Sequence, residues 1–238
     1  AERKMLLVTP PLVAWLALLI GLVLTGSRAG LLAAVVGAAV QGALLAWPRR
    51  RWKLAPVGLV VVLVGLGIVA GVASLSAFGR LGATSFDEVA WGARSEVAGR
   101  TLGLWGRFPV TGSGLGTYAD AYATVEPTGQ LAGLWLHAHN DYLELLATGG
   151  PIAALLVMLA LLALLRRLSR VLARGRRSED RAAALAALGA LAAVAVHEAF
   201  DFGLTMPAVA VILAVVCGAG AGARTAHRRP VSARREAS

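Results

Sequence analysis

Cysteine and charged side chains are scarce in this sequence. Cys217 is the only cysteine among 238 residues, so an internal disulfide is excluded. Charged residues make up 15% of the chain and are nearly absent from six long runs, whereas apolar residues make up 58%. A soluble protein of this length would have too little polar surface to enclose six buried apolar helices. The composition therefore indicates a protein of the lipid bilayer.

The six apolar runs are long enough to be interpreted as membrane-spanning helices. About 17–25 residues cross the hydrocarbon core, and flanking residues extend the shorter runs. A cleaved signal peptide does not fit, because the first run contains Pro10 and Pro11 and no small-residue cleavage site follows it. The runs cover residues 5–24, 29–47, 54–77, 151–165, 182–196 and 204–222. We therefore predict an all-α integral membrane protein with about six transmembrane helices.

The positions of the basic residues predict how the chain is oriented in the membrane. The net charge is +10, and 18 of the 23 Lys and Arg residues lie at alternating ends of the apolar runs. By the positive-inside rule, both termini are cytoplasmic, and the turn at Arg28, the segment 78–140 and the turn 197–202 lie outside. The basic clusters are thus expected to set topology and contact membrane lipids, and not to bind nucleic acid.

The predicted outer loop, about residues 78–140, is the place where we expect the chemistry. It is rich in tryptophan and tyrosine, which favour the membrane interface, and it is too short and too interrupted by Gly and Pro to form its own core. We therefore expect short interfacial helices between the third and fourth spans. Within this loop, Gly112, Gly114 and Gly116 form a glycine-rich turn. It is either a phosphate cradle or a tight turn between helices, and it matches neither a P-loop nor a dinucleotide fingerprint.

His139 and Asn140 belong to the most informative stretch of the sequence. Asp141 and Glu144 are spaced as in a capping box, which predicts that a helix begins near Asn140. His139 would then precede a helix N-terminus, whose dipole disfavours protonation and leaves the imidazole available as a base. Two alternatives are an interfacial histidine bonded to backbone and, with His137, a zinc ligand. No strong third and fourth ligand spacing follows, so we predict no metal and no cofactor.

Arginines at the predicted outer edge are candidates for binding an anion. Arg28 interrupts the first apolar hairpin, where a turn arginine often extends to the interface without any further function. An arginine kept at that depth can also pair with an anionic ligand, and Arg94 is a second candidate on the same side.

Four features in order resemble the bacterial O-antigen ligase and polymerase family. They are the turn ending in Arg28, Arg94 fifteen residues before Pro109, the Gly112–Gly116 turn, and His139-Asn140 followed by Gly150. Ala98 stands where the family usually has an aromatic residue, so Arg100 is a competing assignment for the loop arginine. The turn with His197 and Asp201 is also similar to the family's last outer turn. The resemblance covers nearly the whole chain, residues 1–238, as one polytopic membrane domain.

The resemblance implies a glycosyltransferase of the bacterial inner membrane with its active site on the periplasmic side. The donor would be a glycan on undecaprenyl diphosphate, and the acceptor would be lipid A core, another glycan or a protein. The resemblance implies a metal-independent, inverting reaction. His139, Arg94 and Arg28 are the expected catalytic residues, and the expected substrate-binding residues are Asn140, Tyr142, Gly112, Gly114, Gly116, Tyr118, His197 and Asp201.

Two further expectations concern the extent of the chain and a rival function. Family members usually have additional spans before the Arg28 turn, and this chain begins at Ala1, so we expect it to be the later part of a longer protein. A solute transporter is the alternative function. That reading predicts ionisable groups within the spans and an internal repeat, and the sequence shows neither.

Overall fold

The structure, a computed structural model, describes residues 2–46, 84–126 and 135–222, and every regular element in these ranges is a helix. The prediction of an all-α protein is therefore confirmed for the described residues. The predicted third span, residues 54–77, lies outside them. In chain order the elements are α1 (Glu2–Leu24), α2 (Arg28–Ala46), α4 (Thr84–Arg107), α5 (Tyr118–Ala123), α6 (Asp141–Arg174), α7 (Ser178–His197), the 3-10 helix η2 (Gly203–Thr205) and α8 (Pro207–Gly222).

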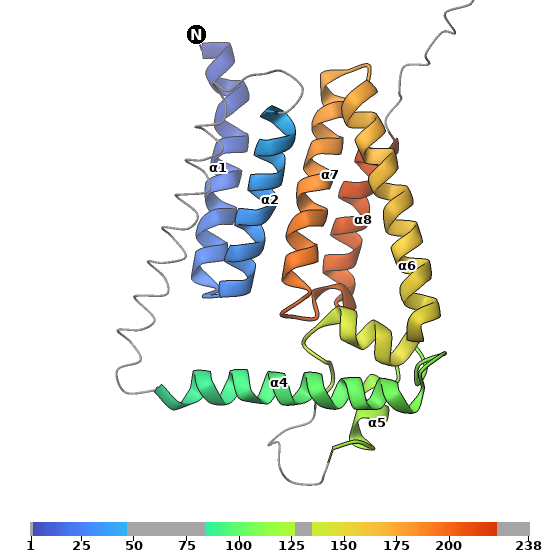
Figure 1. Ribbon diagram of the computed structural model, residues 1–238. Helices are drawn as coiled ribbons and strands as arrows, with labels where there is room; N and C mark the ends of the chain where they lie inside the picture. The colour runs from blue at the N-terminus through green and yellow to red at the C-terminus, as the bar shows by residue number, and fades with distance from the viewer. Residues whose placement is uncertain (1, 47–83, 127–134, 223–238) are drawn as a thin grey trace, which may run out of the picture.

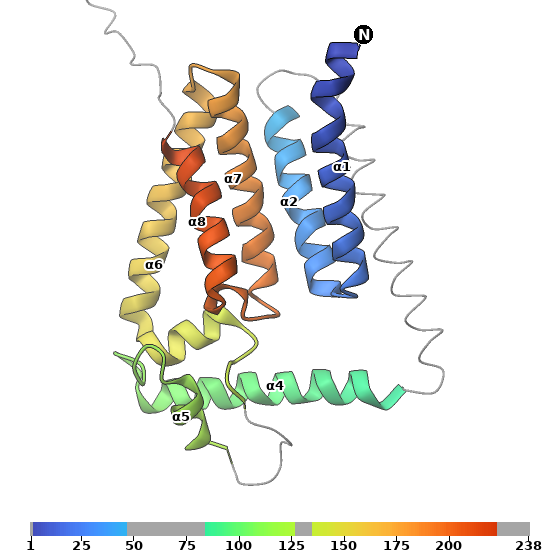
Figure 2. The same cartoon turned by 180° about the vertical axis from the view of Figure 1, so that it is seen from behind.

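Three of the described helices are long and apolar enough to cross a membrane, namely α2, α6 and α7. Two further apolar helices are shorter. One is α8, and the other is Val13–Leu24, the last part of α1. The upright helices run side by side, and α4 lies across one end of them (Figures 1 and 2). The turn between α1 and α2, the turn between α7 and α8, and the start of α6 are all at this same end (Figure 1). This end of the bundle is where segments distant in sequence meet.

Close packing of α2 on α7 fixes the relative height of these two antiparallel helices. A Cβ atom on Gly37 would lie 2.8 Å from the carbonyl oxygen of Gly189 and 3.0 Å from Cβ of Ala193. Arg28 is nine positions before Gly37, and His197 is eight positions after Gly189. At a rise of about 1.5 Å per residue, Arg28 and His197 each lie about 12–14 Å from the contact between Gly37 and Gly189, towards the same end of the bundle. Arg28 therefore lies at the level of His197.

A kink divides α6 into a short first part and a long apolar part. Gly150 has φ 66° and is followed by Pro151, which has no N–H to give to the carbonyl of Ala147. The glycine-rich turn supplies the missing donors, because Ser113 N–H donates to Ala147 O at 2.9 Å and Gly114 N–H donates to Thr148 O at 2.8 Å. The part of α6 before the kink runs across the end of the bundle, near α4 (Figure 1).

Backbone contact between the turn and the kink requires glycine at both places. A Cβ atom on Gly150 would lie 2.7 Å from the Gly112 nitrogen, and Gly112 itself is buried with φ 68° directly against the backbone of Thr148. In this structure, therefore, three residues of the glycine-rich turn are used to dock onto α6.

The Gly37 contact provides a test of the α2–α7 packing. Gly37→Ala should lower the free energy of unfolding by about 1–3 kcal/mol, because the added methyl group meets backbone that cannot move aside easily. Gly21→Ala on α1 is the matched control, since its Cβ would meet no atom within 4 Å. Thermal unfolding in detergent micelles measures both, and equal stability of the two variants would contradict the packing.

Candidate functional site

Hydrogen bonds attach the segment before α6 to the end of α7. The Asn140 side chain accepts from Leu143 N–H at 3.0 Å and so caps α6, while its amide group donates to Ala199 O at 3.0 Å. The Asp141 N–H donates to Glu198 O at 3.0 Å. The predicted helix start near Asn140 is confirmed.

The predicted capping box of Asp141 and Glu144 is wrong in its residues. The cap is Asn140, one position earlier, so Glu144 lies beyond the position where a capping box needs it. Glu144 instead accepts from Ala138 N–H at 2.9 Å and contacts His137 Nδ1 at 3.1 Å. Its carboxylate therefore holds the irregular segment that leads to His139.

His139 is held in an unusual backbone conformation at this junction. Its φ is 51°, which is uncommon for a residue other than glycine. Its ring meets the ring of Phe202 edge-on, with centroids 4.8 Å apart, and the ring of Trp135 at 5.4 Å. Burial lowers the pKa of His139, and the nearby positive charge of Arg94 lowers it further, against the opposing effect of Asp201. Both effects favour the neutral imidazole that the sequence predicts, and burial is the larger of the two.

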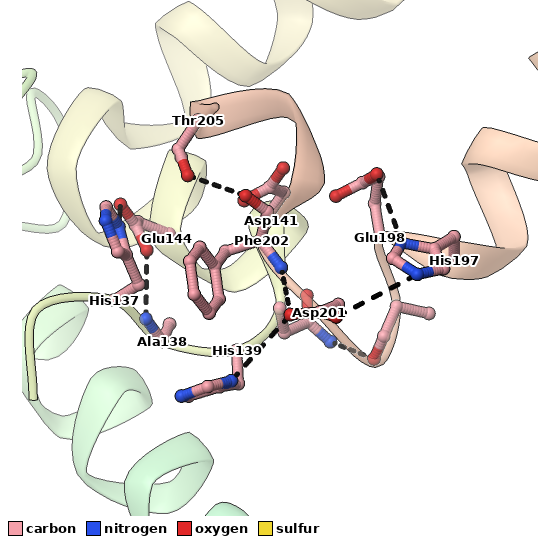
Figure 3. A network of polar contacts seen from close by, with 12 residues as sticks. His137, Ala138, His139, Asp141, Glu144, His197, Glu198, Asp201, Phe202 and Thr205 are labelled. Carbon is pink, nitrogen blue, oxygen red and sulfur yellow. Dashed lines mark hydrogen bonds and ion pairs between the residues drawn. The ribbon is translucent and has the colours of Figure 1, made fainter. Parts of the chain in front are cut away.

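Asp201 lies between two histidines. Its carboxylate is 3.9 Å from His139 Nδ1 and 3.8 Å from His197 Nε2, which are ion-pair distances longer than a hydrogen bond (Figure 3). Nδ1 of His139 is buried and faces Asp201, while Nε2 is on the other side of the ring (Figure 3). A carboxylate beside Nδ1 favours a proton on that nitrogen and leaves the Nε2 lone pair free.

A cavity of about 180 Å³ brings Arg94, His139 and Asn140 together. Pockets that enclose a whole ligand are larger, roughly 300–1,000 Å³. This cavity therefore fits a reacting group whose remainder extends outside. Three segments contribute to its wall, namely α4, the stretch before α6 and the turn after α7. The lining residues are Arg94, Ser95, Ala98, Ala138, His139, Asn140, Ala199 and Phe200.

The competing arginine on α4 points elsewhere. Arg100 pairs with Glu96 and lies near Tyr122, where burial raises the pKa of the phenol and the charge of Arg100 opposes that rise. Six residues separate Arg94 from Arg100, which is about 240° around a helix, so the two side chains occupy different faces. Arg94 is the one at the cavity.

Several predicted residues lie outside the cavity wall. Tyr118 is buried, with its hydroxyl 2.7 Å from that of Thr101 and its ring stacked on Tyr122. Tyr142 is exposed, and its hydroxyl donates to Ala195 O at 2.7 Å. Arg28 is the first residue of α2 and is exposed. Their contacts with a substrate remain predictions, as do those of Gly112, Gly114, Gly116 and His197.

Sequence reasoning did not select Phe202 and Phe200. Phe202 stacks on His137 with centroids 4.6 Å apart and also contacts His139, so it separates the two histidines (Figure 3). Phe200 is 38% exposed and lines the cavity. Both lie in the short turn after α7. The concentration of aromatic and acidic residues in this turn is the sequence feature that could have identified them. Within the described ranges, no group of three His, Cys, Asp or Glu residues is arranged to hold a metal ion.

Comparison with known proteins gives one match. A family model described as O-antigen ligase matches residues 12–158, which is more than half of the chain. The matched region includes Arg28, Arg94, the glycine-rich turn and His139. No curated protein and no solved structure matches the chain.

The charge of Arg94 should set the titration of His139. Arg94→Gln should raise the His139 pKa, because removing a nearby positive charge makes protonation easier. NMR of labelled imidazoles in micelles measures the midpoint, with His139→Gln used to assign the signal. Arg107→Gln on the same helix is the control, since Arg107 binds Thr124 O instead. An unchanged midpoint in Arg94→Gln would show that the two groups are not coupled.

Proposed function

Because the chain belongs to the O-antigen ligase family, we propose that it transfers a glycan from undecaprenyl diphosphate to an acceptor hydroxyl at the periplasmic face of the inner membrane. The acceptor is lipid A core, another lipid-linked glycan or a protein. The observation that carries this proposal is the cavity in which Arg94 and a neutral His139 meet. It supplies an anion-binding group and a proton acceptor in one place.

His139 acts as the base that activates the acceptor. The acceptor hydroxyl gives its proton to Nε2 of His139 as its oxygen forms a bond to the anomeric carbon of the donor sugar. The bond from that carbon to the diphosphate oxygen breaks, and the diphosphate leaves with the electron pair. Attack opposite the leaving group inverts the anomeric configuration. Asp201 supports the imidazolium that forms, because its carboxylate faces Nδ1.

Arg94 and Arg28 bind the diphosphate and stabilise the charge that develops on it. A guanidinium group suits phosphate oxygens, and two of them replace the charge that a metal would supply. Arg94 lines the cavity, and the α2–α7 contact supports Arg28 at the level of His197. The diphosphate would thus lie between α4 and the first hairpin.

The remaining predicted residues arrange the site around this chemistry. Asn140 lines the cavity and contacts the acceptor or donor sugar. Gly112 and Gly114 hold the kink of α6, and exposed Gly116 leaves room for the glycan nearby. The other residues that contact the substrate are Tyr142, Tyr118, His197 and Asp201, of which exposed Tyr142 is nearest to solvent. The lipid tail of the donor stays in the bilayer beside the apolar helices.

Removal of the base should stop glycan transfer. His139→Ala in the full-length protein should slow transfer by about 100-fold or more, the usual range for losing a general base. The assay is transfer from an undecaprenyl-diphosphate-linked glycan in membranes with matched protein levels. His137→Gln is the histidine control and should cost less than about tenfold, because His137 is not part of the cavity wall. Normal transfer by His139→Ala would refute the base assignment.

Replacement of the hairpin arginine should weaken use of the donor. Arg28→Lys keeps the charge but loses the planar fork, so we expect about a tenfold lower kcat/KM for the lipid-linked donor. Arg107→Lys is the matched control and should leave this value within about twofold, because Arg107 donates to Thr124, away from the cavity wall. Equal values for the two variants would remove Arg28 from the site.

A further inference from the structure

Two carboxyl groups meet beside the cavity, where the start of α6 contacts the turn after α7. Glu198 is only 1% exposed. The N–H of Leu204 donates to both groups, to Asp141 Oδ2 at 2.9 Å and to Glu198 Oε2 at 3.2 Å. Two neighbouring carboxylates that share one donor, one of them fully buried, repel each other unless one is protonated.

The residues around this pair leave room for the Glu198 carboxyl group and leave one oxygen of Asp141 without a donor in the described part of the chain. Gly203 is buried, and a Cβ atom there would lie 2.5 Å from Glu198 Oε1, so a larger residue would displace the carboxylate from its present position. Oδ1 of Asp141 is buried and has no donor among the described residues. A buried carboxylate oxygen without a donor is costly, whereas a protonated carboxyl group becomes a donor itself.

We propose that Asp141 and Glu198 share one proton and act as positioning residues that hold His139 and Asn140 against the end of α7. The backbone already links the same residues, because Asp141 N–H donates to Glu198 O and the Asn140 side chain donates to Ala199 O. Loss of the shared proton leaves two adjacent negative charges across this junction. Their repulsion separates α6 from α7 and displaces His139 from the cavity.

The charged neighbours of the pair agree with this assignment. Asp141 precedes the Gly150 kink and lies outside the apolar part of α6. Burial raises the pKa of Asp141 to about 7, the neighbouring Glu198 carboxyl group raises it further, and the Leu204 N–H opposes the rise. Glu144 on α6 adds to it. His197 Nδ1 is 3.5 Å from Glu198 Oε1, and His197 Nε2 is 3.8 Å from Asp201 Oδ2. The helices η2 and α8 carry no ionisable side chain besides Cys217.

The sign of the pH dependence follows from the direction of this shift. The pKa of Asp141 is higher in the folded chain than its ordinary value of 3.8, so the folded state binds the proton more strongly. The stability that this proton contributes is present at low pH and is lost as the pH rises from about 4 to about 7. The junction is therefore tight in mild acid and weaker above neutral pH.

Thermal unfolding of the full chain in micelles tests the pair without any substrate. Between pH 5 and 8 the unfolding temperature of the wild type should fall by about 3–6 °C. Asp141→Asn should lose most of this fall, because the amide donates to Glu198 at every pH. Glu198→Gln should move the fall to lower pH, since the negative charge of Glu198 then no longer raises the pKa of Asp141. Asp120→Asn, an exposed carboxylate on α5, is the control and should keep the wild-type dependence.

A second measurement separates positioning from simple stabilisation. This arm rests on the proposed function: transfer by the wild type should decline above neutral pH, and Asp141→Asn should keep its rate at pH 8 relative to pH 6. Infrared spectroscopy at pH 6 should show a protonated carboxyl band that Asp141→Asn removes. An unchanged pH dependence of unfolding in Asp141→Asn, or the same band in both proteins, would overturn the shared proton. Absence of transfer in the wild type would refute only the proposed function.

Discussion

Two hydrogen bonds between the start of α6 and the end of α7 hold the candidate site together. They run from Asp141 N–H to Glu198 O and from the Asn140 side chain to Ala199 O. The residues on one side include His139, and those on the other include Asp201 and Phe200, so this junction brings His139, the Asp201 carboxylate and the cavity wall together. The cap of α6 also fixes the candidate site, because the Asn140 side-chain oxygen accepts from Leu143 N–H in α6 while its amide group donates to Ala199 O after α7.

The kink in α6 makes that junction possible. Pro151 removes a hydrogen bond from the helix and Gly150 turns the chain, so the first part of α6 can run across the bundle before the apolar part continues along it. The glycine-rich turn occupies the carbonyls that the kink exposes. Glycine is required on both sides because the two backbones touch. A motif that looks like a ligand cradle in the sequence thus has a structural task in the fold.

In the proposed function, the charge of Arg94 would link binding of the donor to the basicity of His139. In the structure its charge helps to keep the pKa of His139 low. A diphosphate bound by Arg94 would neutralise that charge, so the imidazole would become more basic when the donor is present. Asp201 acts in the same direction from the other side of the ring. The base would then be strongest in the complex where a proton has to be accepted.

The sequence by itself determined the membrane character, the helical class and the order of the motifs, because run length, charge position and residue spacing are local properties. It also located the start of α6 near Asn140. It could not choose between Arg94 and Arg100, since that depends on which face of α4 packs against the bundle. It misassigned the cap to Asp141 and overlooked Phe200 and Phe202. It also gave no reason to join Asp141 with Glu198, 57 residues away. Those choices belong to the tertiary structure, because burial, ion pairs and shared donors arise only when distant segments meet at one end of the bundle.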